Sequence, residues 1–98
     1  MGLRHIVTLT FRDGTTARDA EAIAAALREL PEQIPELRSY VVGVDAGLSE
    51  GNASLAVVAD FDSVEDWRTY RDHPAHQAVI TQQIVPVLAG RSAVQHHT

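Results

Sequence analysis

The sequence predicts an α+β fold built on a four-stranded antiparallel sheet. Some stretches alternate apolar and polar residues with the two-residue period of a strand, and others space their apolar residues as a helix does. These stretches follow one another in the order β-α-β-β-α-β, with no linker, repeat or low-complexity segment between them. Right-handed crossovers turn this order into a ferredoxin-like fold, in which the helices cover one face of the sheet.

The first strand and the first helix have the clearest patterns. Residues 3–11 alternate, which predicts a strand with one apolar face that also contains a histidine. That face carries Leu3, His5, Val7, Leu9 and Phe11. Thr16 and Asp19 have the spacing of a capping box and predict the start of a helix. Its apolar residues have helical spacing and stop near two prolines: Ala20, Ile23, Ala24, Leu27 and Leu30, then Pro31 and Pro35.

Two further strands are expected after this helix. Residues 38–46 are rich in β-forming side chains and predict the second strand. After a polar loop over residues 47–52, residues 53–61 alternate and predict the third strand. Its apolar face carries Leu55, Val57, Ala59 and Phe61.

The helical region after the third strand contains two prolines that divide it. Ser63 is expected to cap a short helix, and Pro74 is expected to begin the last helix, because proline suits the first helical position. Pro86 cannot donate a backbone hydrogen bond, so we expect a kink or an end there, with Gly90 as the C-terminal cap. Residues 91–96 then predict the fourth strand.

The composition indicates a single domain over residues 1–98. A formal net charge of −5 argues against nucleic acid as a partner, since no basic stripe is present to contact phosphates. The absence of cysteine excludes disulfides, thiolate metal sites and cysteine nucleophiles. No apolar run is long enough to cross a bilayer, and Arg4, His5 and Arg12 interrupt the early apolar stretch that a signal peptide needs. We therefore expect a cytoplasmic protein that does not act at a membrane.

The predicted sheet has a second apolar face that no helix covers. This face is expected to carry Ile6, Val41, Ala56, Val58 and Ala93. An exposed apolar sheet face is typical of a partner surface, and a two-fold axis buries the same patch twice. We expect a homodimer that forms through this open face.

The string Tyr70-Arg71-Asp72-His73-Pro74-Ala75-His76 is the strongest candidate site. Because Pro74 disfavours helical geometry at His73, His76 falls in the first turn of a new helix, near its partly positive end. His76 is therefore expected to stay neutral near pH 7 and to accept a proton, with Tyr70 as the acid facing it across an enclosed hollow. The structural alternatives are a locally hydrogen-bonded His76, a core Tyr70 and a His73 that caps the helix.

Five segments, in order over nearly the whole chain, carry a family resemblance. They are His5-Ile6-Val7, Leu30-Pro31-Glu32-Gln33-Ile34-Pro35, Val42-Gly43-Val44-Asp45, Phe61-Asp62-Ser63-Val64-Glu65 and Tyr70-x-x-His73-Pro74-x-His76. With these segments the chain resembles the stress-responsive A/B barrel family, also called Dabb domains, and is similar to its polyketide cyclase-type members. The resemblance implies ferredoxin-like monomers whose sheets pair into a dimeric α/β barrel.

In the cyclases of this family the tyrosine and the second histidine of the string act as acid and base. The resemblance assigns these catalytic roles to Tyr70 and His76, with His5 as a further polar group in the cavity. The expected substrate-binding residues are His5, Val7, Leu9, Ile23, Leu27, Val57 and His73. The leading hypothesis is a dimeric enzyme that binds a small carbonyl compound and catalyses a cyclase, lyase or isomerase step with no cofactor and no metal.

Two other functions stay open. One is a non-enzymatic stress-responsive dimeric domain, whose barrel contributes stability or ligand binding. The other is a ferredoxin-like monooxygenase, which shares the fold but not the histidine string. A weak metal site at His73 and His76, with His5 or Asp72 as a third ligand, is disfavoured because His-x-x-His across a proline break is poor ligand spacing.

Overall fold

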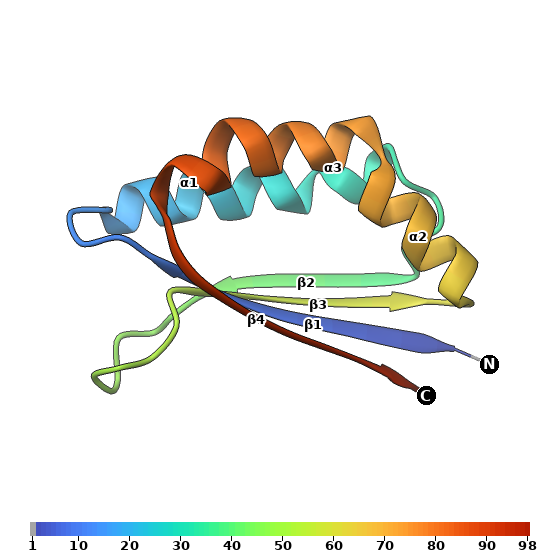
Figure 1. Ribbon diagram of the computed structural model, residues 1–98, viewed down its shortest axis with the longest axis horizontal. Coiled ribbons are helices and arrows are strands. Elements are labelled where there is room, and N and C mark those ends of the chain that lie inside the picture. The colour runs from blue at the N-terminus through green and yellow to red at the C-terminus, as the bar shows by residue number, and fades with distance from the viewer. Residues whose placement is uncertain (1) are drawn as a thin grey trace.

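The computed structural model describes residues 2–98 and has the expected order of elements around one antiparallel sheet (Figure 1). The strands lie in the order β2-β3-β1-β4 across the sheet. Their bounds are Leu3–Phe11 for β1, Ser39–Val44 for β2, Leu55–Phe61 for β3 and Leu88–His97 for β4. The helices lie on one side of the sheet, and the other side is uncovered (Figure 1). This is the ferredoxin-like α+β fold that the sequence predicts.

The helical layer consists of three helices and three short helical turns. The helices are α1 (Ala17–Arg28), α2 (Val64–Asp72) and α3 (Pro74–Val79). A π-helical turn spans Ile80–Ile84, and 3₁₀ turns span Leu30–Glu32 and Val85–Val87. Over the part of the chain that the structure describes, none of these helices has both the length and the apolar character needed to cross a membrane.

Strand β1 lies inside the sheet and pairs with β3 on one side and β4 on the other. Its odd-numbered side chains face the helices and are all buried: Leu3, His5, Val7, Leu9 and Phe11. Helix α1 buries its predicted apolar face against them with Ala20, Ile23, Ala24 and Leu27. The core therefore sits between the middle of the sheet and the helical layer.

Helix α1 begins with the predicted capping box. The Thr16 side-chain oxygen accepts a hydrogen bond from the Asp19 backbone nitrogen at 3.0 Å. The Asp19 carboxylate accepts one in return from the Thr16 backbone nitrogen at 3.1 Å. These bonds satisfy two backbone donors that the start of a helix leaves without partners.

The second and third strands are shorter than predicted. Residues 38–46 contain a strand only over Ser39–Val44, and β3 begins at Leu55 rather than at residue 53. The Asp45 carboxylate accepts hydrogen bonds from the Gly47 backbone nitrogen at 3.0 Å and from Asn52 Nδ2 at 3.2 Å. These bonds fold the loop back directly after Val44 and end β2.

The helical region ends at Pro86 as expected, but without the expected glycine cap. The helix widens into the π-helical turn, and Pro86 lies in the 3₁₀ turn that ends the helical region. The prediction that Gly90 caps this helix is wrong, because β4 already begins at Leu88 and Gly90 pairs with Thr10 inside the sheet.

The uncovered face of the sheet carries a row of aliphatic side chains that crosses every strand. The register pairs Val41 with Val58, Val58 with Ile6 and Ile6 with Val94, and we call these four residues the apolar row. Val41 is 61% exposed and Val94 is 52% exposed. Ala93 was expected on this face, but the pleat turns it to the opposite side and places its neighbour Val94 here instead.

We expect Thr16→Ala to lower the free energy of unfolding by about 1 kcal/mol, because it removes the side-chain half of the capping box. Urea unfolding followed by circular dichroism measures this change. Thr16→Ser is the control, since it keeps the hydroxyl acceptor and should be nearly as stable as wild type. A Thr16→Ala protein with the same unfolding midpoint as wild type would contradict a stabilising role for this cap.

Candidate active site

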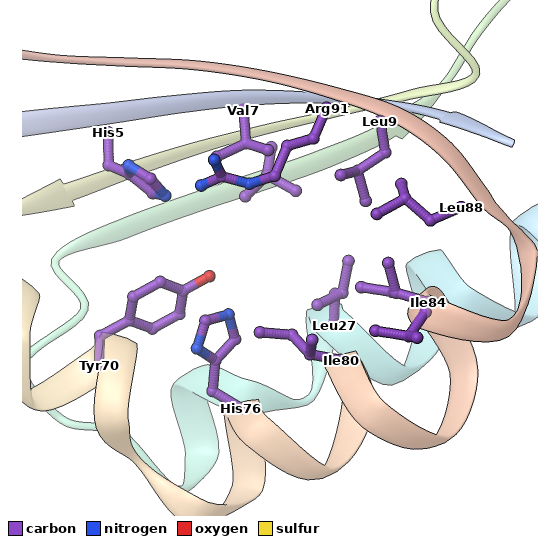
Figure 2. Close-up of a pocket in the computed structure, with 12 residues that line it drawn as sticks. His5, Val7, Leu9, Leu27, Tyr70, His76, Ile80, Ile84, Leu88 and Arg91 are labelled. Atoms are coloured by element: carbon purple, nitrogen blue, oxygen red, sulfur yellow. The ribbon is translucent and has the colours of Figure 1, made fainter.

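A cavity of about 120 Å³ lies between the covered face of the sheet and the helical layer (Figure 2). It is lined by His5, Val7, Leu9, Leu27, Val57, Tyr70, His76, Ile80, Ile84, Val85, Leu88 and Arg91. The structure thus brings together most of the residues that the sequence analysis selected. Two of them, Ile23 and His73, are not among the lining residues. Ile23 is buried in the hydrophobic core, and His73 lies between two helices.

The cavity has a polar end and an aliphatic end. Figure 2 shows the rings of His5, Tyr70 and His76 and the side chain of Arg91 gathered at one end. The other end is formed by Leu9, Leu27, Ile80, Ile84 and Leu88. A bound molecule would therefore direct its polar group toward the rings and its hydrocarbon part toward the leucines and isoleucines.

The predicted acid–base pair comes together because the chain breaks between α2 and α3. His73 is extended, with φ of −64° and ψ of 133°, and Pro74 is the first residue of α3. His73 Nδ1 accepts a hydrogen bond from the Ala75 backbone nitrogen at 3.1 Å, so this side chain caps α3. The break brings Tyr70, near the end of α2, beside His76, in the first turn of α3.

The rings of Tyr70 and His76 stack on each other. Their centroids are 4.1 Å apart and their planes differ by 25°. The expectation that the two rings face each other across a hollow is wrong, because both side chains leave the same helical wall (Figure 2). The wall opposite to them is the sheet, which contributes His5 and Arg91.

His76 can accept a proton. Its Nδ1 lies 3.2 Å from the backbone oxygen of Arg71. A carbonyl oxygen only accepts, so Nδ1 carries the hydrogen of the neutral ring and Nε2 keeps its lone pair. Burial lowers the pKa of His76, as do the nearby His73 and Arg91, while hydrogen bonds to the backbone at Arg71 and Tyr70 act to raise it. Burial is the largest of these effects and favours the neutral ring.

Tyr70 belongs to a pair of hydrogen-bonded phenols. Its hydroxyl oxygen lies 2.9 Å from that of Tyr40 on β2, and either group can donate. Burial raises the pKa of both phenols, so both keep their protons near neutral pH. When Tyr40 donates, the Tyr70 O–H stays available to a third group. No sequence pattern singled out Tyr40; strand register places it opposite Ala59, which in turn lies opposite His5.

His5 is a buried neutral donor on the sheet side of the cavity. The Gln95 amide nitrogen donates to His5 Nδ1 at 2.7 Å, so the proton of the neutral ring is on Nε2. Burial lowers the pKa of His5 to about 4, and Arg91 and His76 contribute to the lowering. His5 therefore offers an N–H donor to the cavity, whereas His76 offers an acceptor nitrogen.

Arg91 also lines the cavity, although no sequence pattern singled it out. It pairs with Leu9 in the sheet and so shares the covered side with the odd-numbered residues of β1. Strand alternation would have placed Arg91 on the covered face only if the register of β4 against β1 had been known. The remaining unpredicted lining residues are Ile80, Ile84, Val85 and Leu88. The spacing of Ile80 and Ile84 marks an apolar helix face but does not distinguish the core from a cavity wall.

The lining residues suit proton transfer beside a carbonyl group. They comprise a neutral base in His76, hydrogen-bond donors in Tyr70 and His5, and a cation in Arg91. No carboxylate lines the cavity. Across residues 2–98, no three histidine, aspartate or glutamate side chains come together in a way that could hold a metal ion.

Comparison with known proteins identifies relatives of the whole chain. Residues 3–96 match the sequence model of the stress-responsive A/B barrel domain. No curated protein matches the sequence. Among solved structures, a dimeric ferredoxin-like protein of unknown function from Thermobifida fusca YX is 45% identical. The match covers 100% of this chain and 92% of that chain, with a TM-score of 0.90.

Two more distant structures share the fold. A dimeric ferredoxin-like protein of unknown function from Bacteroides fragilis NCTC 9343 is 24% identical over 99% of this chain and 96% of that chain, with a TM-score of 0.84. The hydroxynitrile lyase of Passiflora edulis is 19% identical over 99% of this chain and 93% of that chain, with a TM-score of 0.83. Similar structures therefore include dimers and one lyase.

The low pKa of His5 predicts a loss of stability in mild acid. Between the ordinary value of 6.5 and the folded value of about 4, the unfolded chain binds a proton that the folded chain does not. The free energy of unfolding should therefore fall as the pH falls through this window, and the slope should be smaller in His5→Gln. Urea unfolding at several pH values measures the slope, and NMR titration of the His5 ring gives its pKa directly. Titration of His5 near 6.5 would contradict this prediction.

Proposed function

The chain belongs to the stress-responsive A/B barrel domain family, and we propose that it binds a small carbonyl compound in its cavity and catalyses proton transfer on it without a cofactor. The observation that carries this proposal is the His76 ring, which lines the cavity with its Nε2 lone pair free and stacks on Tyr70. A base that is uncharged near neutral pH is suited to remove a proton from the carbon next to a carbonyl group.

The proposed step uses groups that line the cavity. His76 Nε2 takes a proton from the carbon beside the carbonyl and becomes an imidazolium. The electron pair of the broken C–H bond forms a C=C bond, and the carbonyl π pair moves onto oxygen to give an enolate. Tyr70 O–H and His5 Nε2–H donate hydrogen bonds to that oxygen, where the negative charge gathers. The oxygen pair of the enolate then reforms the C=O bond in one of two ways. In a lyase step the C=C pair moves to the next carbon, the bond from that carbon to the leaving group breaks with its electron pair, and the leaving group takes the proton from the His76 imidazolium; in an isomerase step a carbon of the enolate system takes that proton.

The volume of the cavity favours a short aliphatic substrate. An engineered apolar cavity of about 150 Å³ holds benzene, and the cavity here is smaller, at about 120 Å³. An aromatic polyketide therefore suits it poorly, and we favour a lyase or isomerase step over polyketide cyclisation. The hydroxynitrile lyase of Passiflora edulis shows that a protein of this fold carries a lyase activity.

A ligand-binding domain without turnover is the second candidate. It is favoured by the hydrogen bond between Tyr40 and Tyr70, because in the arrangement where Tyr70 donates to Tyr40 the Tyr70 proton is already engaged. In this function the rings orient a carbonyl ligand but no proton moves. The two candidates differ in whether His76 is needed for a reaction or only for affinity.

We further propose that two copies associate through the uncovered face of the sheet. The apolar row crosses this face, and the ion pair of Arg4 with Asp60, at 2.8 Å, lies beside it on the same face. A two-fold axis would bury the row against its own copy and remove an exposed apolar patch from water. The similar proteins from Thermobifida fusca and Bacteroides fragilis are dimeric.

We expect Val58→Arg to convert the dimer into a monomer, because it places a charge in the middle of the apolar row. Sedimentation equilibrium measures the mass, and circular dichroism checks the fold. Leu48→Arg is the matched control: Leu48 is 86% exposed in the loop between β2 and β3, and its replacement should leave the dimer intact. A wild-type monomer, or a Val58→Arg dimer of unchanged affinity, would contradict the proposed interface.

We expect His76→Ala to slow catalysed proton exchange by roughly 10²–10⁴-fold, the contribution typical of a positioned base. The measurement is the replacement of the α-protons of butanone by deuterium in D2O, followed by NMR. His97→Gln, at the exposed end of β4, is the control and should keep the wild-type rate.

The same experiment separates the two candidate functions. If butanone shifts the resonances of cavity residues but its α-protons exchange no faster than in buffer, the protein binds the ketone without turnover. Equal exchange rates in wild type and His76→Ala would remove His76 from the mechanism.

A further inference from the structure

Arg91 brings a permanent positive charge to the polar end of the cavity. Its side chain runs along the sheet wall toward His5 and lies across the cavity from Tyr70 and His76 (Figure 2). Burial is the main cause of the pKa shifts of these three groups, and the charge of Arg91 acts on each of them as well. The guanidinium therefore acts on the three ionisable groups that line the cavity with it.

No acidic side chain neutralises this charge within residues 2–98. The ion pairs of this region involve Arg4, Arg28, Arg38, Arg68 and Arg71. Arg91 takes part in none of them, and the residues that line the cavity include no aspartate or glutamate. The chain as a whole has a formal net charge of −5, so this cation is not one of many on a basic surface.

An unpaired guanidinium at the wall of an apolar cavity favours a ligand that carries its own negative charge. Guanidinium groups bind carboxylates through parallel charge-assisted hydrogen bonds, which are among the stronger polar contacts in proteins. The aliphatic end of the cavity, with Leu27, Ile80 and Ile84, suits the hydrocarbon part of such a ligand. The polar end offers the donors and the base described above.

We infer that the ligand of this cavity is a short aliphatic 2-oxo acid, whose carboxylate binds Arg91. In such an acid the ketone is next to the carboxylate, which matches a cavity whose cation, donors and base gather at one end. The ketone oxygen then lies toward His5 and Tyr70, and the carbon that loses a proton lies toward His76. The ketone part of this inference depends on the proposed function, whereas the carboxylate part depends only on the position and charge of Arg91.

Pyruvate and pyruvamide are matched probes for this inference. The two molecules have nearly the same shape and the same ketone, but pyruvate carries a carboxylate where pyruvamide carries a neutral amide. We expect the wild-type protein to bind pyruvate roughly tenfold more tightly than pyruvamide, as measured by NMR chemical-shift titration. Arg91→Gln should make the two affinities nearly equal, and Arg91→Lys, which keeps the charge, should retain part of the preference. Arg18→Gln, at an exposed position of α1, makes the same change in net charge and should leave the preference intact.

The outcomes distinguish this inference from the proposed function. His76→Ala should keep the preference for pyruvate while losing proton exchange at the pyruvate methyl group. A preference for pyruvate without any catalysed exchange in wild type rejects the proposed function and leaves the anion site standing. Equal affinity of wild type for the two probes, no saturable binding of pyruvate, or an unchanged preference in a folded Arg91→Gln protein overturns the inference. Equal weakening of both probes by Arg91→Gln also overturns it, because Arg91 would then contact the ketone or the tail.

Discussion

The two-residue period of β1 is the constraint on which the rest of the structure depends. This strand hydrogen-bonds to β3 and β4, so its register fixes the faces of both neighbours. Its odd-numbered residues fill the core and place His5 in the cavity, while Ile6 lies in the apolar row. A slip of one residue would exchange the two faces and destroy the core and the candidate site together. Stability of the fold and placement of the site are therefore set by the same hydrogen bonds.

The polar groups inside this core are tolerated because each has a partner. Gln95 donates to His5 at 2.7 Å, and Tyr40 and Tyr70 share a hydrogen bond of 2.9 Å. Across residues 2–98, no buried side-chain nitrogen or oxygen lacks a hydrogen-bond partner. These bonds also set the proton positions, since the bond to Gln95 leaves His5 a donor and the bond to the backbone leaves His76 an acceptor. The same hydrogen bonds thus satisfy the buried polar groups and fix which ring nitrogen carries the proton.

The candidate site combines two neutral imidazole rings with one cation. Burial lowers the pKa of His5 and His76, so that both rings stay neutral, whereas a guanidinium such as that of Arg91 keeps its charge in proteins. A neutral base and a fixed cation consequently lie in one small cavity. The cation repels protons from the imidazoles and attracts anions. The pKa of His76, on α3, is therefore influenced by a cation on β4.

The sequence by itself determined the order of the elements, the faces of β1 and the break before Pro74, because periodicity, capping and proline geometry act over a few neighbouring residues. It therefore also located His76 and Tyr70 in one site. The stacking of these rings, the contribution of Tyr40 and the position of Arg91 were decided only by the tertiary structure. Tyr40 and Arg91 are placed by the register of distant strands, and the stacking depends on how α2 and α3 pack after the break before Pro74. No local sequence pattern carries that information.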